Sequence, residues 1–245
     1  MLRRSIGRLS LPPRLLLVRH AESLGNTDPT EYARTPDWRI GITAKGVEQA
    51  DDAGKRIATL LQGEPVAMYV SPYKRTKLTA TGIRQHLNVV GEREDPRLRE
   101  QDVGNFQDPA RMKELWSERA TFGRFFYRFP HGENGADVCD RASSFLDSLF
   151  RERAADLEQS EGTNIVIVSH GLFLRLFVMR WFHLTVENFH EMVNPPNCGI
   201  VEFVRIPIAD GRKGATMTLT EESREMLRIP KSVELTGSGH FNDMV

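Results

Sequence analysis

The sequence predicts an α/β fold, a three-layer sandwich in which helices flank a mostly parallel central sheet and a small helical, aromatic-rich cap is inserted. Short apolar runs of strand length alternate along the chain with longer segments of helical periodicity, which is typical of α/β layers. A chain of 245 residues with 40% hydrophobic and 27% charged residues is long and apolar enough to bury its own core. The alternation is interrupted between residues 104 and 136, and we assign the cap to this interruption.

The predicted strands are short apolar runs. They span residues 15–19, 66–70, 165–169, 200–206 and 215–219, with a weaker strand near Val89. Helices are predicted to begin at Thr43 and Ser71, because each offers a side-chain oxygen that can cap free N–H groups, and Pro72 suits a first helical position. Longer helices are predicted over 137–158 and 172–182.

We expect a single domain over residues 14–228, between a flexible N-terminal arm (1–13) and a flexible C-terminal tail (229–245). The start of the chain is rich in arginine and has no acidic residue, so an organelle transit peptide is an alternative interpretation of the arm. Adjacent prolines near its end would break an amphipathic helix, and the cytoplasm is the expected location. Glycine and serine close to the C-terminus predict the flexible tail.

Composition excludes several classes of protein. Lys plus Arg and Asp plus Glu both number 33, and this net charge of zero argues against a nucleic-acid partner. The apolar runs are far shorter than the roughly 18 residues of a membrane span, so no membrane partner is expected. The two cysteines, Cys139 and Cys198, lie far apart and outside any zinc-ligand spacing, and we expect Cys198 to be a small buried residue. The sequence does not indicate an oligomeric state.

The segment 104–130 combines aromatic residues with cations. Its basic residues are Arg111, Lys113, Arg119, Arg124 and Arg128. One interpretation is a small helical subdomain that packs its aromatic side chains on the edge of the sheet. The other is a lid whose cations collect an anionic substrate, and the two interpretations are compatible.

Two predicted strands end in a histidine. Residues 15–19 lead into His20, and residues 165–169 lead into His170. Ligands of parallel sheets bind beyond the carboxyl ends of the strands, so we expect the two histidines to converge on one site. A single histidine after a strand is more often structural, but two histidines in the same setting favour a functional site.

Charged residues are expected at the same edge of the sheet. Arg75 follows the predicted strand 66–70 and falls in the first turn of the next helix, where free N–H groups and the helix dipole favour an anion. The alternative interpretation is an ordinary surface ion pair. Glu100 is a candidate proton donor, but its position in the sequence does not separate it from Asp95 or Asp102.

Several motifs occur in the order seen in the histidine phosphatase superfamily, in its phosphoglycerate mutase-like branch. They are residues 17–23 (LVRHAES) with Asn26, 42–46 (ITAKG), 71–75 (SPYKR) with 79–80, Glu100, and 169–171 (SHG). The chain resembles this family over roughly residues 14–205. Segments 99–107 and 125–133 further resemble the fungal and plant proteins described as broad-range acid phosphatases.

The resemblance implies phosphoryl transfer through a phosphohistidine. It implies that His20 is the nucleophile, that Arg19 and Arg75 hold the transferring phosphoryl oxygens with support from His170, and that Glu100 is the general acid and base. Further substrate contacts are expected from Asn26, Glu22, Ser23 and His131. Neither a metal ion nor a cofactor is expected, because fixed guanidinium groups stabilise the charge of a phosphoryl group in transfer.

The residues after Glu100 bear on the choice of reaction. Mutases of this superfamily place an arginine and a tyrosine there to hold the carboxylate end of phosphoglycerate, whereas this chain has Gln101, Asp102 and Val103. An acidic side chain at this point is expected to repel such a substrate. We therefore expect hydrolysis of a small phosphorylated substrate. The alternatives are a cofactor-dependent phosphoglycerate mutase and a catalytically idle module that binds a phosphorylated ligand.

Overall fold

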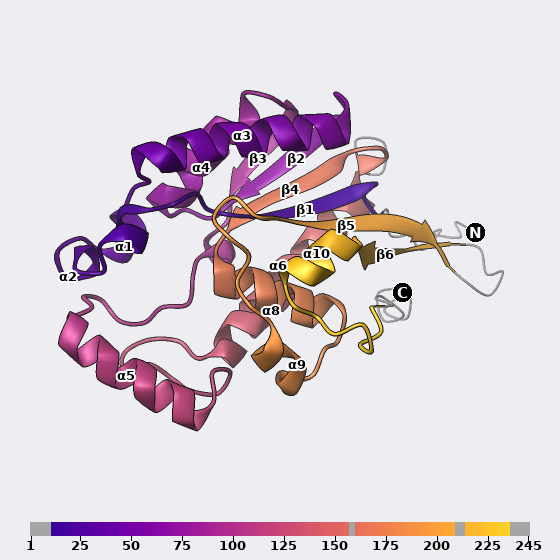
Figure 1. The fold of residues 1–245 in the computed structure, drawn as a ribbon. Helices are drawn as coiled ribbons and strands as arrows, with labels where there is room; N and C mark the ends of the chain where they lie inside the picture. Colours follow the sequence, from indigo (N-terminus) through magenta and orange to yellow (C-terminus); the bar gives the residue numbers. More distant parts are fainter. Residues whose placement is uncertain (1–10, 157–159, 209–213, 236–245) are drawn as a thin grey trace.

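A computed structural model describes residues 11–156, 160–208 and 214–235 and contains one six-stranded sheet (Figure 1). Its strands are β1 (Arg14–Arg19), β2 (Pro65–Val70), β3 (Asn88–Glu94), β4 (Asn164–Ser169), β5 (Ile200–Pro207) and β6 (Ala215–Leu219). They lie in the order β3-β2-β4-β1-β5-β6. Strands β3, β2, β4 and β1 are parallel, whereas β5 runs antiparallel to both β1 and β6. The predicted α/β class with a mostly parallel sheet is confirmed.

Helices cover both faces of the sheet, which makes the three layers. The upper layer of Figure 1 contains α3 (Ala44–Leu61) and α4 (Lys74–Arg84), and the lower layer contains α6 (Gly135–Ala155) and α8 (Gly171–Trp181). Side chains of a strand alternate between its faces. Leu15 and Leu17 of β1 therefore join the core under α6 and α8, while Leu16 and Val18 join the core under α3 and α4. Burial on both faces explains why the central strands are continuous apolar runs.

The helix starts agree only in part with the expected caps. The Thr43 hydroxyl accepts a hydrogen bond from the Gly46 amide at 3.0 Å and begins α3 as predicted. The prediction at Ser71 is wrong, since α4 begins at Lys74 and the Ser71 hydroxyl instead bonds the His170 ring. Helix α6 is capped by Asn134 and begins two residues before the predicted start at 137.

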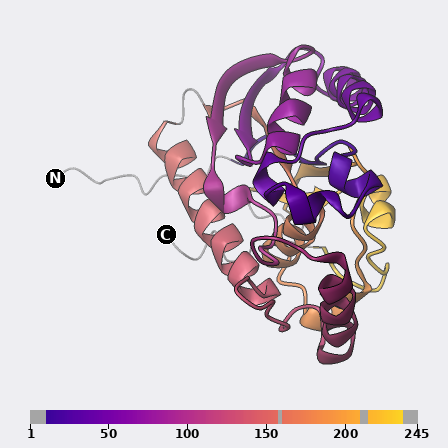
Figure 2. The same ribbon diagram turned by 90° about the vertical axis from the view of Figure 1, so that its left-hand side faces the viewer.

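The remaining helices are short. They are α1 (Leu24–Thr27), α2 (Glu31–Arg34), α9 (Val186–Glu191) and α10 (Glu221–Met226), with the 3₁₀ helices η1 (Asp37–Arg39) and η2 (Pro96–Leu98). Helices α1 and α2 lie beyond the carboxyl end of β1, on the side of the molecule that faces the viewer in Figure 2.

The cap consists of helix α5 (Pro109–Phe122) and its flanking loops, and α5 stands apart from the sheet in Figures 1 and 2. We expected its aromatic side chains to pack on the sheet edge, but Tyr127 and Phe129 form a separate small core with Met112. Phe125 does join the main core. Because α6 already begins at Gly135, the cap ends slightly earlier than expected.

The packed domain extends beyond both expected boundaries. Leu11 is buried, and the Arg205 amide of β5 donates to the Pro13 carbonyl at 3.2 Å. At the other end, Ile229 and Leu235 are buried in the main core, so residues 229–235 are not the start of a flexible tail. Apolar side chains hold both segments to the sheet layer. The rest of the arm, the rest of the tail and the predicted end of the 137–158 helix lie outside the described residues.

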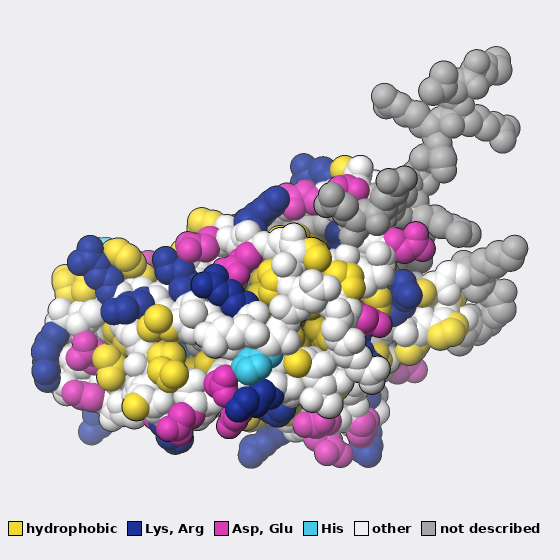
Figure 3. All heavy atoms as spheres, turned by 90° about the horizontal axis from the view of Figure 1, so that it is seen from above, with side chains coloured by type: hydrophobic (Ala, Val, Ile, Leu, Met, Phe, Trp, Pro, Cys, Tyr) yellow, Lys and Arg dark blue, Asp and Glu magenta, His cyan; other side chains and the backbone are white. Residues whose placement is uncertain are grey.

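Charged side chains of both signs are interspersed on the face covered by α3 and α4 (Figure 3). This pattern fits the net charge of zero. Among the described residues, no helix is long and apolar enough to cross a bilayer.

Candidate active site

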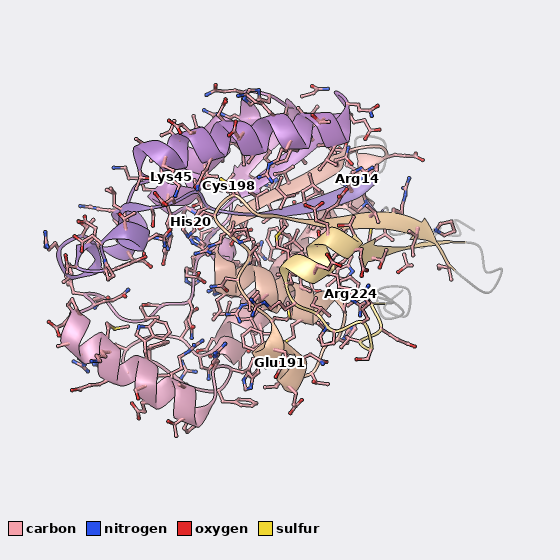
Figure 4. The ribbon with its side chains drawn as sticks, viewed as in Figure 1. Arg14, His20, Lys45, Glu191, Cys198 and Arg224 are labelled. Carbon is pink, nitrogen blue, oxygen red and sulfur yellow. The ribbon has the colours of Figure 1, made fainter. Side chains whose placement is uncertain are left out.

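A cavity of about 620 Å³ opens at the carboxyl ends of the parallel strands. Figure 4 shows Arg14 and His20 at opposite ends of β1, with His20 on the side of α1 and α5. The cavity volume falls within the usual range for ligand pockets, about 300–1,000 Å³. Residues expected at the site that line this cavity are Arg19, His20, Asn26, Arg75 and Glu100.

His20 has the protonation state of a nucleophile. Its Nδ1 lies 2.7 Å from the Ala21 carbonyl oxygen, which can only accept, so Nδ1 carries the proton and Nε2 keeps its lone pair. Burial lowers the pKa of His20 well below its usual value, and the positive charges of Arg75 and Arg19 lower it further. Burial and the neighbouring arginines therefore favour the neutral imidazole.

The ring of His170 packs against the ring of His20. The two ring centroids are 5.3 Å apart, and His170 Nε2 lies 2.8 Å from the Ser71 hydroxyl oxygen. Within the described part of the chain, His170 Nδ1 has no hydrogen-bond partner. Burial, and then the charge of Arg75, lower the pKa of His170 well below its usual value. The structure thus brings together the two histidines that the strand ends predicted.

Arg19 and Arg75 direct guanidinium groups at the same end of the cavity. Arg19 donates through Nη1 to the Pro195 carbonyl at 2.7 Å. Arg75 donates through Nη1 to the Asp37 carbonyl at 2.9 Å and to its carboxylate at 2.6 Å. The Nε atoms of both arginines are buried without a partner among the described residues. Arg75 does form the ion pair of the alternative interpretation, with Asp37, but it is buried and not on the surface, and its Nε remains as a spare donor for an anion.

The structure separates the three acids that the sequence left equivalent. Glu100 lines the cavity. Asp95 is instead bound by the Arg97 side chain at 2.6 Å, and Asp102 accepts a hydrogen bond from the Gly104 amide at 2.9 Å. Of these three acids, Glu100 alone lines the cavity.

The position of Asp102 overturns the expected repulsion of phosphoglycerate. Its carboxylate turns back into its own loop and does not line the cavity. The neighbouring Gln101 lines the cavity instead. The choice between hydrolysis and mutase activity thus has to rest on other residues.

A buried arginine fixes the loop that carries Glu100. Arg141 of α6 donates to the carbonyls of Arg97 at 2.7 Å, Arg99 at 2.8 Å and Glu100 at 3.1 Å. It also pairs with Glu133 at 3.0 Å, whose carboxylate accepts from the Asp102 amide at 3.1 Å. We call Arg141, Glu133 and the loop 97–102 the arginine clamp. Sequence reasoning missed it, because Arg141 falls within an ordinary amphipathic helical pattern.

Of the four further residues expected to contact the substrate, only one lines the main cavity. Asn26 lines the cavity and accepts a hydrogen bond from the Ser23 amide at 3.1 Å. Glu22 pairs with Lys45 at 2.8 Å, and the buried Ser23 does not line the cavity. His131 lines a separate cavity of about 180 Å³ beside α5. The structure does not bring Glu22, Ser23 or His131 to the main cavity.

Two of the cations that the lid interpretation named, Lys113 and Arg119 of α5, line the main cavity. Sequence reasoning missed Arg175 of α8, which lines the cavity as well. Arg175 lies among the apolar residues of the first turns of α8, and a charged residue in such a run is a signal that would have identified it. The cap residues lie far along the chain from the strand ends, so their position depends on the tertiary fold.

The described residues include no group of three or more His, Cys, Asp or Glu side chains that could hold a metal ion. Cys198 is buried and free, as expected, and burial raises the pKa of its thiol to about 12. The charged and titratable groups that line the cavity include guanidinium groups, the Lys113 ammonium, the His20 imidazole and two carboxylates, of which Asp37 pairs with Arg75 at 2.6 Å.

The family model of the histidine phosphatase superfamily (branch 1) matches residues 15–211. The chain is 48% identical over 202 residues to the phosphoglycerate mutase-like protein AT74 of Arabidopsis thaliana, covering 78% of this chain and 64% of AT74. It is 44% identical over 109 residues to the broad-range acid phosphatase DET1 of Saccharomyces cerevisiae, covering 44% of this chain and 33% of DET1. The chain thus spans less than two thirds of the length of either relative.

A similar solved structure is that of the open reading frame Rv3214 product of Mycobacterium tuberculosis. It matches with a TM-score of 0.62 and 26% identity, covering 84% of this chain and 95% of that one.

Proposed function

Because the chain belongs to the histidine phosphatase superfamily (branch 1), we propose that it is a metal-independent phosphomonoester hydrolase that acts through a phosphohistidine on His20. The observation that carries the proposal is the state of His20: the bond from Nδ1 to the Ala21 carbonyl leaves Nε2 unprotonated, next to Arg19 and Arg75. The similarity to a broad-range acid phosphatase supports hydrolysis as the reaction.

In the first step, the phosphoryl group of the substrate lies between the guanidinium groups of Arg19 and Arg75. His20 Nε2 attacks phosphorus, a new N–P bond forms, and the bond from phosphorus to the leaving oxygen breaks. Glu100, protonated, gives its proton to that oxygen, so the alcohol leaves neutral. The arginines stabilise negative charge on the phosphoryl oxygens as it redistributes.

In the second step, a water molecule replaces the alcohol. The Glu100 carboxylate takes a proton from the water, the oxygen attacks phosphorus, and the N–P bond breaks. Phosphate leaves, while Glu100 is protonated and His20 is neutral again. When the Ser71 hydroxyl donates to His170 Nε2, His170 Nδ1 carries the proton, and this N–H has no partner among the described residues.

A phosphoglycerate mutase is the second candidate. The orientation of Asp102 away from the cavity favours it, because no acid of that loop except Glu100 opposes a carboxylate. The similarity to a phosphoglycerate mutase-like protein agrees with this alternative. Conversion of 3-phosphoglycerate to its 2-isomer without release of phosphate would establish it in place of hydrolysis.

The test of the proposal is hydrolysis of p-nitrophenyl phosphate in the presence of EDTA at mildly acidic pH. We expect phosphate release at the same rate with and without EDTA. His20→Ala is expected to lower kcat by at least about 10³-fold, because the covalent route is lost. The wild-type enzyme is expected to yield an acid-labile phosphoenzyme that the variant lacks.

His86→Ala is the matched control, because His86 lies outside the main cavity and pairs with Asp51 at 2.7 Å. It should retain wild-type activity. Activity that disappears with EDTA, or full activity in His20→Ala, would contradict the proposal. Tight binding of phosphorylated compounds without turnover would instead indicate the idle module.

A further inference from the structure

Gln101 is a polar residue of the main cavity to which the proposed mechanism gives no role. It is buried, with 3% of the residue exposed, yet it lines the cavity directly after Glu100. Its main-chain N–H donates to the Glu100 carboxylate at 3.0 Å, within the loop that Arg141 holds through the Glu100 carbonyl at 3.1 Å. The Gln101 side chain therefore lies beside the proposed acid and base, on the same fixed loop.

The orientation of the Gln101 side-chain amide is set by its partner. Nε2 donates to the Glu133 carbonyl oxygen at 2.8 Å, and because a carbonyl oxygen can only accept, the amide cannot be turned around. Oε1 accepts no hydrogen bond from a described residue, and it is not among the side-chain atoms that are sealed from solvent without a partner. Since the solvent-filled space that Gln101 lines is the main cavity, Oε1 offers an acceptor to it.

A fixed acceptor beside Glu100 bears on the second step, in which water attacks phosphorus. A water molecule carries two hydrogens, and it gives one of them to the Glu100 carboxylate. The other hydrogen stays on the attacking oxygen and needs an acceptor. An alcohol in the same place has one hydrogen for Glu100 and presents carbon to the second acceptor, which is then left without a partner. An acceptor at this position therefore favours water over an alcohol as the attacking group.

Gln101 thus bears on the choice between hydrolysis and transfer. We propose that Gln101 Oε1 accepts the second hydrogen of the attacking water and so selects hydrolysis of the phosphohistidine over transfer to an alcohol. The inference rests on the proposed function. One O–H bond of water breaks as its proton passes to Glu100, the oxygen bonds phosphorus as the bond to His20 Nε2 breaks, and the second hydrogen leaves on phosphate. Gln101 contacts the reacting water but exchanges no proton.

Rapid kinetics with p-nitrophenyl phosphate separates the two steps. Release of nitrophenol measures formation of the phosphohistidine, and release of phosphate measures its hydrolysis. In Gln101→Met, which has neither donor nor acceptor, we expect the rate constant of hydrolysis to fall about tenfold or more, while that of phosphohistidine formation changes less than about twofold. With glycerol present, the ratio of glycerol phosphate to free phosphate among the products should rise several-fold.

Gln101→Met also removes the bond to the Glu133 carbonyl, so a second variant separates the two effects. Gln101→Lys keeps a donor for that carbonyl but offers no acceptor to the cavity. We expect it to show the same slow hydrolysis and the same shift towards glycerol. Gln107→Met is the matched control, because Gln107 is a glutamine that lines the same cavity from the cap loop, where its main-chain N–H donates to the Tyr32 carbonyl at 3.2 Å. It should keep the wild-type ratio of transfer to hydrolysis.

The outcomes separate this inference from the proposed function. A wild-type ratio of transfer to hydrolysis in both Gln101 variants would overturn the role of Gln101 and leave the hydrolase intact. Recovery of hydrolysis in Gln101→Lys, or equal slowing of both steps, would also overturn it, because the loss would then come from the loop and not from Oε1. The same shift in Gln107→Met would assign the effect to the cavity in general. Absence of a phosphoenzyme and of phosphate release in the wild type would overturn the hydrolase itself.

Discussion

Two regions next to the cavity each contain a buried arginine, and the two arginines differ in what surrounds them. In the arginine clamp, Arg141 donates to three backbone carbonyls and pairs with Glu133. In the cap, Arg119 contacts aromatic rings and forms no polar bond with a described residue. The difference teaches that burial alone does not define a role: a guanidinium with a complete set of acceptors positions the chain, and one without them is available to a ligand.

A similar difference separates the two ends of the cavity. Arg75, near the sheet, already has the Asp37 carboxylate at 2.6 Å, whereas Arg119 and Arg175 have no carboxylate at ion-pair distance among the described residues. At the end near the sheet, the Asp37 carboxylate therefore already binds Arg75, and a phosphoryl group has to share the donors of Arg75 with it or displace it. No such competing carboxylate of the described residues binds the arginines at the end formed by the cap.

The largest effect on kcat is expected from replacing Glu100, the acid of the loop that the arginine clamp fixes. Glu100→Gln should lower kcat by about 10²–10⁴-fold for glycerol 3-phosphate, because its alkoxide leaves poorly without a proton. The loss should be much smaller for p-nitrophenyl phosphate, whose leaving group needs little protonation. Steady-state kinetics with both substrates measures this ratio. Equal losses with both would show that Glu100 has another role.

A smaller effect is expected from weakening the clamp itself. Arg141→Lys keeps the positive charge but cannot reproduce a planar fork that reaches three carbonyls and a carboxylate. We expect kcat for glycerol 3-phosphate to fall about tenfold, a loss of roughly 1.4 kcal/mol in transition-state stabilisation, with a weaker effect on p-nitrophenyl phosphate.

The same leaving-group dependence as in Glu100→Gln would identify Arg141 as a positioning residue for that carboxyl group. Arg180→Lys serves as the control, because Arg180 lies near the opposite end of α8 from His170 and bonds the Ser143 hydroxyl at 2.8 Å. A purely structural role of Arg141 would lower activity on both substrates alike and would lower thermal stability.

The smallest effect tests the difference between the two ends of the cavity. Asp37→Asn removes the competing carboxylate from Arg75, so inorganic phosphate should inhibit hydrolysis of p-nitrophenyl phosphate at a several-fold lower concentration. Asp28→Asn is the control, since Asp28 lies on the same side of the molecule but bonds only Thr30 at 2.7 Å among described side chains, outside the cavity. Unchanged or weaker inhibition in Asp37→Asn would show that Asp37 holds Arg75 in place rather than competing with phosphate.

The sequence was sufficient to predict those features that depend on one local pattern of residues. An apolar run followed by a histidine predicts both a strand and the position of its carboxyl end, and this placed His20 and His170 at one edge of the sheet. The predicted strands are all present in the structure. The predicted start of the helix after β2 was wrong, because the side chain of Ser71 does not cap this helix and instead bonds His170, which is 99 residues away in sequence.

The sequence by itself determined the α/β class, the order of the strands along the chain and the residue types that meet at their ends. Tertiary structure decided which partner each charged group has. Asp102 turns to Gly104, Arg141 binds the loop of Glu100, and Arg119 has no polar partner among the described residues. The physical reason is that strand and helix patterns depend on neighbours along the chain, whereas the partners of a buried charge are groups that only the fold brings within hydrogen-bonding distance.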